Sequence, residues 1–430
     1  MKTLREYYEA ALGLAEGTPG DVYFIEEART RVLSEPAPAK IAVPPFDCAV
    51  ADGFALCRMC ALYAAGMDHI NSPTDVTLTL DKPVTLPVVA DIPVGCTDVP
   101  AFARGHAFRV MSGAPLPEQV DVVIDHAHID SVTPSEEGAL PKDITITSLP
   151  PRGRNMRTKG ENIAEGEVVF EAGHHLGPAA LATLVSVGYD RVTVHRQPRV
   201  GVLVTGPQLR SPGEDLAPGQ IPDSNTLMIE QLLQGAGAHT LRMGSAGDDA
   251  KAMSSMADWA LDQGLDLLVT SGGTAAGLFD IAKIALEPRG VEFMDVSIQP
   301  GGHQGLGLID GKLPCLALPG SPEAAFVSMI LFVLPLVRKL NGDPPRGLEE
   351  SLTIGSAGQA WTKSTDAAQL IPCAPREDGM YYPFASGGMG THLISTFHAA
   401  THVAYLPRDL ERVEVGDALQ LFPLQIHEAL

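Results

Sequence analysis

The sequence has no apolar run long enough to span a bilayer. Its most apolar stretch, Ala324 to Val337, is shorter than the roughly 20 residues of a transmembrane helix, and it contains Pro335. The chain starts with an amphipathic pattern followed by glycine and proline, without the apolar block of a signal peptide. We therefore expect no membrane partner, and we expect residues 324–337 to form a buried helix.

Cysteines and basic residues are also scarce. The 6 cysteines are scattered without the spacing of a disulfide framework, which favours free thiols in a cytoplasmic protein. The 30 lysines and arginines face 52 acids, and the formal net charge is −22. Because such a field repels nucleic acid and anionic lipid, neither is an expected partner. An anionic small molecule would need local compensation from helix N-termini, a few basic side chains or a metal ion.

The chain of 430 residues is long enough for about two to four domains. Helical patterns in the first forty residues, at "REYYEAALGLA" and around "IEEARTRVLSEP", give way to short β-rich pieces between Pro44 and Pro151. From about residue 196 strands alternate with helices, which predicts an α/β domain with a parallel sheet. After about residue 343 the pattern is β-rich again. The expected fold class is therefore α/β plus β, in several domains.

Three predicted strands of the α/β region end in glycine-containing loops: "VLVTGPQL", "LVTSGGTAAG" and "LALPGSPEAA". The carboxyl ends of parallel strands are where ligands collect, and glycines there allow the backbone to approach a ligand closely. In the third loop, Ser321 is a candidate N-cap and Pro322 suits the first helical position. The alternative is that all three loops are ordinary strand-to-helix turns. Their occurrence together at one sheet edge favours a ligand site.

Two acids stand in comparable loops. Asp280 ends the glycine-rich stretch and is a candidate N-cap, or a carboxylate that a divalent cation bridges to a phosphate. Asp52 lies in "PPFDCAVADGFAL", where an ordinary tight turn is the alternative to a functional carboxylate. Positive charges gather in "RGRNMRTKGENIAEG", residues 152–166, a candidate anion site. Cys57 and Cys60 have zinc-like spacing but lack a second pair, which favours buried thiols.

In chain order, several stretches resemble the successive motifs of one family, the molybdopterin molybdenumtransferases (the MoeA family, related to the E domain of gephyrin). They are "PPFDCAVADGFAL", "MSGAPLPEQVDVVI", "RGRNMRTKGENI", "PGEDLAPGQIPDSN", "SGGTAAGLFD" and "LPGSPEAA". The resemblance extends over essentially the whole chain. It implies that molybdate and adenylylated molybdopterin, or molybdopterin itself, are the substrates, that molybdenum cofactor and AMP are the products, and that Mg²⁺ is required.

The resemblance also implies four domains in each subunit of an elongated homodimer. Residues 1–43 and 151–195 would form a segmented first domain, and residues 44–150 an inserted small β domain. Residues 196–342 would form the α/β molybdopterin-binding domain, and residues 343–430 a C-terminal β-barrel. The active cleft would lie between the α/β domain of one subunit and the inserted domain of the other. Other cofactor-synthesis proteins are possible further partners.

Site residues carry over by position in these motifs. The resemblance implies catalytic roles for Asp52, Asp280 and Asp248 (or its neighbour Asp249), with Asp52 and Asp280 as metal ligands. The positions implied to bind substrate are Ser112, Gly113, Gly206, Gln208, Ser271, Gly272, Gly273, Gly277, His303, Pro319, Gly320, Ser321 and Pro322.

Other positions depart from the family pattern. Gln208 replaces an acid, Ala275 and Leu278 replace a hydroxyl and an acid, and "QPGGH" (Gln299 to His303) lacks both family lysines. The usual arginine of the last domain has no counterpart in "WTKSTDAAQLIPC". Each lost basic residue removes a charge-assisted hydrogen bond worth roughly 1.5–3 kcal/mol, and a protonated His303 could replace one. A second hypothesis is therefore a non-catalytic relative that binds a pterin as a carrier or scaffold.

Overall fold

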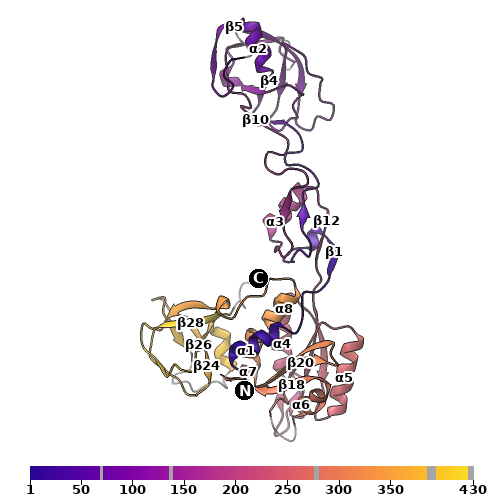
Figure 1. The fold of residues 1–430 in the computed structure, drawn as a ribbon, viewed down its shortest axis with the longest axis vertical. Helices are drawn as coiled ribbons and strands as arrows, with labels where there is room; N and C mark the ends of the chain where they lie inside the picture. The colour runs from indigo at the N-terminus through magenta and orange to yellow at the C-terminus, as the bar shows by residue number, and fades with distance from the viewer. Residues whose placement is uncertain (68–70, 135–138, 276–279, 385–393, 425–430) are drawn as a thin grey trace.

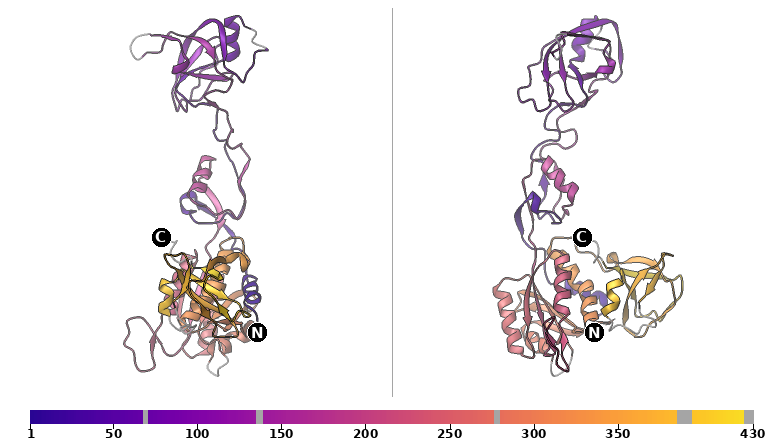
Figure 2. Two further views of the ribbon diagram at one scale, coloured as in Figure 1. Left: turned by 90° about the vertical axis from the view of Figure 1, so that its left-hand side faces the viewer. Right: turned by 180° about the vertical axis from the view of Figure 1, so that it is seen from behind.

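The computed structural model describes residues 1–67, 71–134, 139–275, 280–384 and 394–424, and the chain is elongated (Figure 1). A six-stranded sheet, here called the distal unit, lies at one end of the long axis. The α/β sheet and a C-terminal sheet lie side by side at the other end (Figure 2). A small middle unit of paired strands and one helix connects them.

The distal unit has the strand order β7-β4-β6-β5-β9-β8. Its core is apolar and separate from the other cores, with Phe54, Leu56, Ile124 and Ile146 among the buried side chains. One helix, α2 (Arg58–Ala65), packs on the long strand β5. The strands are β4 (Gly53–Leu56), β5 (Leu78–Ile92), β6 (Ala107–Val110), β7 (Val122–Asp125), β8 (Ser131–Thr133) and β9 (Asp143–Leu149).

The middle unit joins segments that are far apart in the sequence. β1 (Gly20–Phe24) pairs with β12 (Arg191–His195), and β2 (Ala37–Pro38) pairs with β11 (Val168–Phe170). Helix α3 (Pro178–Ser186) completes this unit. The short pair β3 (Cys48–Ala49) and β10 (Met156–Arg157) lies on the way to the distal unit. The domain limits expected from the sequence remain predictions.

One predicted helix of the first forty residues is wrong. The expected first helix is present as α1 (Leu4–Leu12), but the second is only a 3₁₀ turn, η1 (Ile25–Glu27). Beyond it the backbone N–H groups of Leu33 and Ser34 donate to the carbonyls of His174 and Thr193. No helix forms here because these N–H groups bond to residues about 140–160 positions later in the sequence instead of to carbonyls of their own segment.

The α/β sheet has the order β16-β13-β17-β21-β20-β18, and its first four strands are parallel. β20 and β18 are antiparallel additions that the predicted parallel sheet did not include. The strands are β13 (Arg199–Val204), β16 (His239–Ser245), β17 (Leu267–Ser271), β18 (Val291–Asp295), β20 (His303–Ile309) and β21 (Leu313–Leu318).

Successive residues of these strands face opposite sides, and helices cover both sides. Val269 belongs to the core that contains α1 and α4 (Asn225–Gly235), whereas its neighbour Leu268 belongs to the core beneath α5 (Ala250–Asp262) and α6 (Ile281–Leu286). Both faces are therefore buried, as in other parallel sheets.

The predicted buried helix at residues 324–337 is present in three pieces. Helix α7 (Pro322–Ser328) continues through a π-helical turn, η4 (Met329–Val333), into α8 (Leu334–Leu340). Pro335 lacks the N–H group that would bond to Leu331 in a regular α-helix, and the wider turn lies just before it. In the parts of the chain that the structure describes, no helix is both long and apolar enough to cross a membrane.

The C-terminal sheet has the order β19-β24-β26-β28-β22, with β25 (Tyr381–Pro383) paired to β24. Its first strand, β19 (Ile298–Gln299), comes from the α/β segment and therefore joins the two sheets. Closure of this sheet into a barrel remains a prediction. The other strands are β22 (Thr353–Ser356), β24 (Ala368–Pro375), β26 (His402–Leu406) and β28 (Ala418–Pro423), and a separate pair is formed by β23 (Trp361–Thr362) and β27 (Arg412–Val413).

Candidate active site

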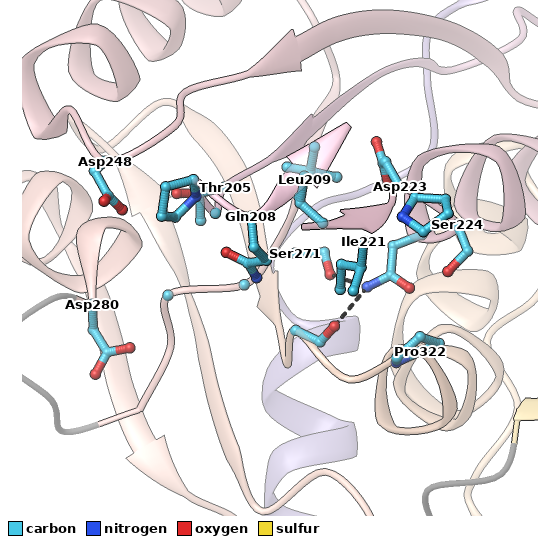
Figure 3. Close-up of a pocket in the computed structure, with 18 residues that line it drawn as sticks. Thr205, Gln208, Leu209, Ile221, Asp223, Ser224, Asp248, Ser271, Asp280 and Pro322 are labelled. Carbon is cyan, nitrogen blue, oxygen red and sulfur yellow. Dashed lines mark hydrogen bonds between the residues drawn. The ribbon is translucent and has the colours of Figure 1, made fainter. Parts of the chain in front are cut away.

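A cavity of about 400 Å³ lies at the carboxyl ends of β13, β17 and β21 (Figure 3). These strands are neighbours in the parallel part of the sheet, and the three loops singled out in the sequence follow them. The start of α4 closes the cavity from another side. It is lined by residues 204–209, 221–225 and 271–273 and by Asp248, Asp280, Gly320 and Pro322.

Glycines allow these loops to come close together. Gly272 and Gly273 have left-handed backbones, with φ of 96° and 66°. A Cβ at Gly272 would lie 2.6 Å from the carbonyl oxygen of Thr205, and one at Gly273 would lie 2.9 Å from the backbone nitrogen of Ala282. A Cβ at Gly320 would lie 3.3 Å from Cα of Gly272. Side chains at these positions would therefore push the loops apart or fill the space between them.

Gln208 takes the place of the acid found in the family motif, and its carboxamide folds back over Gly206. A Cβ at Gly206 would lie only 2.7 Å from Oε1 of Gln208. The loop after β13 therefore presents a neutral amide to the cavity, with one donor and one acceptor group.

The lining is acidic. Asp223, Asp248 and Asp280 contribute carboxylates, and no lysine, arginine or histidine is among the described lining residues. The Asp223 carboxylate accepts hydrogen bonds from the N–H and hydroxyl of Thr226, at 3.1 and 2.5 Å, and thereby stabilises the start of α4. Asp248 and Asp280 lie on the same side of the cavity (Figure 3). An anionic ligand would be repelled here unless a cation accompanied it.

The helix starts differ from one another in detail. Asp249 caps α5, accepting a 2.8 Å hydrogen bond from the Lys251 N–H, so Asp248 is the acid of this pair that faces the cavity. Asp280 and Ser321 occupy the N-cap positions of α6 and α7, but their side chains make no capping hydrogen bond. Pro322 is the first residue of α7, as its sequence position predicted.

A further residue, Asn225, connects the loops and was not singled out from the sequence. Its Nδ2 donates to the hydroxyl oxygen of Ser271 at 2.9 Å and to the carbonyl of Gly320 at 3.0 Å. The Ser271 hydroxyl in turn donates to the carbonyl of Pro319 at 2.9 Å. The motif "GQIPDSN" contains Asn225, but its partners come from distant parts of the sequence.

His303 does not line the cavity. Its imidazole Nδ1 lies 2.5 Å from the Asp295 carboxylate, and its side chain is 61% exposed. The backbone carbonyl of His303 accepts a 3.1 Å hydrogen bond from the hydroxyl of Thr274, which follows the glycine pair. The suggestion that His303 replaces a lysine of the cavity is therefore not supported by its position. Gly277 and Leu278 lie outside the described residues.

Asp52 and Ser112 contact each other, but they lie in the distal unit. The Asp52 carboxylate accepts a 2.7 Å hydrogen bond from the N–H of Ser112, whose hydroxyl donates to the carbonyl of Val50. Gly113, with φ of 86°, completes this turn. Asp52 directly precedes β4, at the opposite end of the molecule from α6 and Asp280 (Figure 1). Within one chain, Asp52 and Asp280 therefore cannot bind the same metal ion, and their assignment as ligands of one metal site remains a prediction that requires a second subunit.

Two segments of the chain match known protein regions. Residues 3–188 match the MoeA N-terminal region (domain I and II), and residues 201–339 match a probable molybdopterin binding domain. The chain is similar to molybdopterin molybdenumtransferase 2 of Mycobacterium tuberculosis, with 29% identity over 434 residues that cover 99% of this chain and 100% of that protein. It is 30% identical to the molybdopterin molybdenumtransferase of Haemophilus influenzae over 417 residues, 93% of this chain and 92% of that one.

The likeness extends to solved structures. The molybdopterin biosynthesis MoeA protein of Pyrococcus horikosii matches with a TM-score of 0.81 and 26% identity, covering 98% of each chain. The likeness therefore extends over nearly the whole chain, beyond the α/β sheet. With 30% identity over nearly the full length of a curated relative, the protein belongs to the molybdopterin molybdenumtransferase family.

Proposed function

We propose that the protein inserts molybdate into adenylylated molybdopterin and releases AMP, as an enzyme of molybdenum cofactor biosynthesis. The observation that carries this proposal is the cavity at the ends of β13, β17 and β21, within the segment that matches a probable molybdopterin binding domain. Apolar Leu209 and Ile221 suit a planar ring, and the neighbouring amide and hydroxyl groups suit the polar edge of a pterin. Full-length relatives are named as transferases, which favours catalysis over a carrier or scaffold role.

Asp248 and Asp280 are suitable ligands for Mg²⁺, because this ion prefers carboxylate oxygens. Among the described residues, no group of three or more His, Cys, Asp or Glu side chains could hold a metal ion. Water and phosphate oxygens would therefore complete the coordination, which is usual for Mg²⁺. When bound, the ion would neutralise part of the phosphate charge beside these acids.

A homodimer would bring the two halves of the site together. Asp52 and the cavity lie at opposite ends of one chain, so a second chain must supply Asp52 if both act on one substrate (Figure 1). Ser112 and Gly113 would enter the same cleft beside Asp52. The free state of all 6 cysteines is in keeping with a cytoplasmic location.

A mixing experiment tests this arrangement. Asp52→Ala and Asp280→Ala homodimers should each be inactive, whereas co-expression of the two should give heterodimers with one intact cleft each. Random pairing then restores about a quarter of the wild-type activity. Absence of any recovery in heterodimers that are shown to form would exclude a cleft shared between subunits, as would a monomer in sedimentation at micromolar concentration.

The activity itself is measured as AMP release from adenylylated molybdopterin in the presence of molybdate and Mg²⁺. A strain that lacks the transferase should regain nitrate reductase activity when it expresses this protein. AMP release no faster than that of the Asp280→Ala variant, together with failed complementation, would contradict the proposal and favour a pterin carrier.

A further inference from the structure

Asn225 connects three elements of the cavity through one side chain. It is the first residue of α4, only 8% exposed, and its Nδ2 bonds to Ser271 at the end of β17 and to Gly320 beyond β21. The Ser271 hydroxyl extends this connection to the carbonyl of Pro319. The Asn225 carboxamide, together with the Ser271 hydroxyl, therefore links the two loops that follow β17 and β21 to each other and to α4.

The orientation of this carboxamide is determined by its partners. The carbonyl of Gly320 can only accept a hydrogen bond, so the amide nitrogen of Asn225 must face it. The other end, Oδ1, is buried and has no hydrogen-bond partner. Because a buried acceptor without a partner destabilises a protein, asparagine is a poor residue here for stability alone.

The connected loops also pack directly against each other. The N–H of Gly272 donates to the carbonyl of Leu318 at 3.0 Å, and Gly320 lies against Cα of Gly272. These contacts involve only backbone atoms, so no side chain in them fixes how the two loops align with each other. Side chains contribute through the two donor bonds of Asn225 and the bond from the Ser271 hydroxyl to Pro319. Asn225 lies at the wall of the cavity and also connects both loops to α4.

We infer that Asn225 is a positioning residue, which holds the loops after β17 and β21 in the arrangement that binds the pterin substrate. The inference rests on the proposed function for the identity of the ligand, but the loop arrangement can be measured without any ligand. Asn225 acts through Ser271 and Gly320, and contact between Asn225 and the substrate is not required.

Two substitutions separate the role of the donor from that of side-chain size. Asn225→Ala removes both bonds and should raise KM for adenylylated molybdopterin roughly five- to tenfold, with kcat changed less than about twofold. Asn225→Asp keeps the shape but places an oxygen against the Gly320 carbonyl, so its KM should rise further. A purely structural role would instead lower the yield of folded protein and leave KM unchanged.

Asn341 provides a matched control. Its Nδ2 also donates to a backbone carbonyl, that of Ala236 at 2.8 Å, but Asn341 follows α8 and does not line the cavity. Asn341→Ala should lower the melting temperature and leave KM unaltered. Equal effects of Asn341→Ala and Asn225→Ala on KM would overturn the inference.

Hydrogen exchange of the ligand-free protein tests the loops themselves. Asn225→Ala should speed exchange at residues 271–274 and 318–320 at least about tenfold, whereas Asn341→Ala should not. Adding Ser271→Ala to Asn225→Ala also removes the bond to the Pro319 carbonyl, so exchange at these residues should become faster still. Unchanged exchange in a folded Asn225→Ala protein would overturn the inference. If Asn225→Ala does not fold, Asn225→Ser gives the same comparison.

The two proposals fail in different ways. A wild-type protein that releases no AMP contradicts the proposed function, while the exchange rates still decide the role of Asn225. A wild-type protein that releases AMP, with an Asn225→Ala variant of unaltered KM and exchange, contradicts only the positioning role.

Discussion

Gly342 lies against the imidazole of His195 so closely that a Cβ at this position would overlap Cδ2 of the ring. His195 ends β12 and Gly342 follows α8, so this contact lies where the middle unit joins the α/β sheet. Nδ1 of His195 donates to the carbonyl of Thr18 at 2.5 Å, and the hydroxyl of Thr18 bonds to the carbonyls of Arg196 and Leu340. These close contacts therefore fix the orientation of the middle unit relative to the α/β sheet at this junction.

Gly342→Ala should destabilise the protein through both backbone strain and the overlap with His195. Its φ of 92° disfavours alanine by about 1–2 kcal/mol, and overpacking adds roughly 1–3 kcal/mol. Gly311→Ala is the matched control, because Gly311 also has a left-handed φ, 69°, but a Cβ there would meet nothing within 4 Å. Urea unfolding should show a larger decrease in the free energy of unfolding for Gly342→Ala than for Gly311→Ala. Equal decreases would mean that a side chain at Gly342 is tolerated beside His195.

Asp52→Asn should leave the fold intact and lower AMP release at least roughly a hundredfold. Asparagine keeps an acceptor for the Ser112 N–H but lacks the charge that a cleft carboxylate would supply. Asp47→Asn is a suitable control, because Asp47 also accepts one backbone hydrogen bond, from Lys159 at 2.7 Å. Similar AMP release by the two variants would exclude a catalytic role for Asp52.

Gly302→Lys should restore one of the missing basic groups. Gly302 is not in the left-handed region, unlike Gly301 with φ of 100°, and a Cβ at Gly302 would make only ordinary contacts of 3.5 Å. We expect tighter binding of adenylylated molybdopterin by about 1–2 kcal/mol at low salt, with a smaller gain as salt is added. Calorimetric titration measures the gain. Gly302→Gln controls for side-chain length, and the same gain from it would rule out a charge effect.

His402 should make stability depend on pH. Burial lowers the pKa of its imidazole, so the folded state favours the neutral ring. The stabilisation of the folded state by neutral His402 is therefore fully present above the unfolded pKa of about 6.5. This stabilisation is lost as the pH falls from there towards the lower folded pKa. Urea midpoints between pH 7.5 and pH 5 should fall less steeply in His402→Gln than in the wild type. Identical slopes would show that burial does not lower the pKa of His402 below that of the unfolded chain.

The cavity loops could be predicted from the sequence because their determinants are local. Gly272 and Gly273 must be glycines for the backbone conformation they adopt, and Pro322 marks the first residue of a helix wherever the helix lies. The parallel direction of β13, β17 and β21 followed from the alternation of strands and helices, whereas their order in the sheet did not. Each of these features depends on a few neighbouring residues.

The other features depend on contacts between distant segments. The bonds of Asn225 to Ser271 and Gly320 form only when the sheet brings three loops together, and nothing in "PDSN" indicates them. The pairing of His303 with Asp295 depends on the antiparallel strands β18 and β20, which are connected without a helix between them. The distance from Asp52 to the cavity depends on how the middle unit extends the chain, which no local pattern encodes.

The packing of α1 sets an order of events during synthesis. The hydroxyl of Tyr7 donates to the carbonyl of Gly305, which lies 298 residues later in the chain, and its ring packs edge-on against Phe332. At about 5–20 residues per second, the ribosome needs roughly 15–60 s to make this partner. The distal unit has its own core and all of its strands by then. Helix α1 therefore waits, with its apolar face uncovered, until the much later segments that pack against it have been translated.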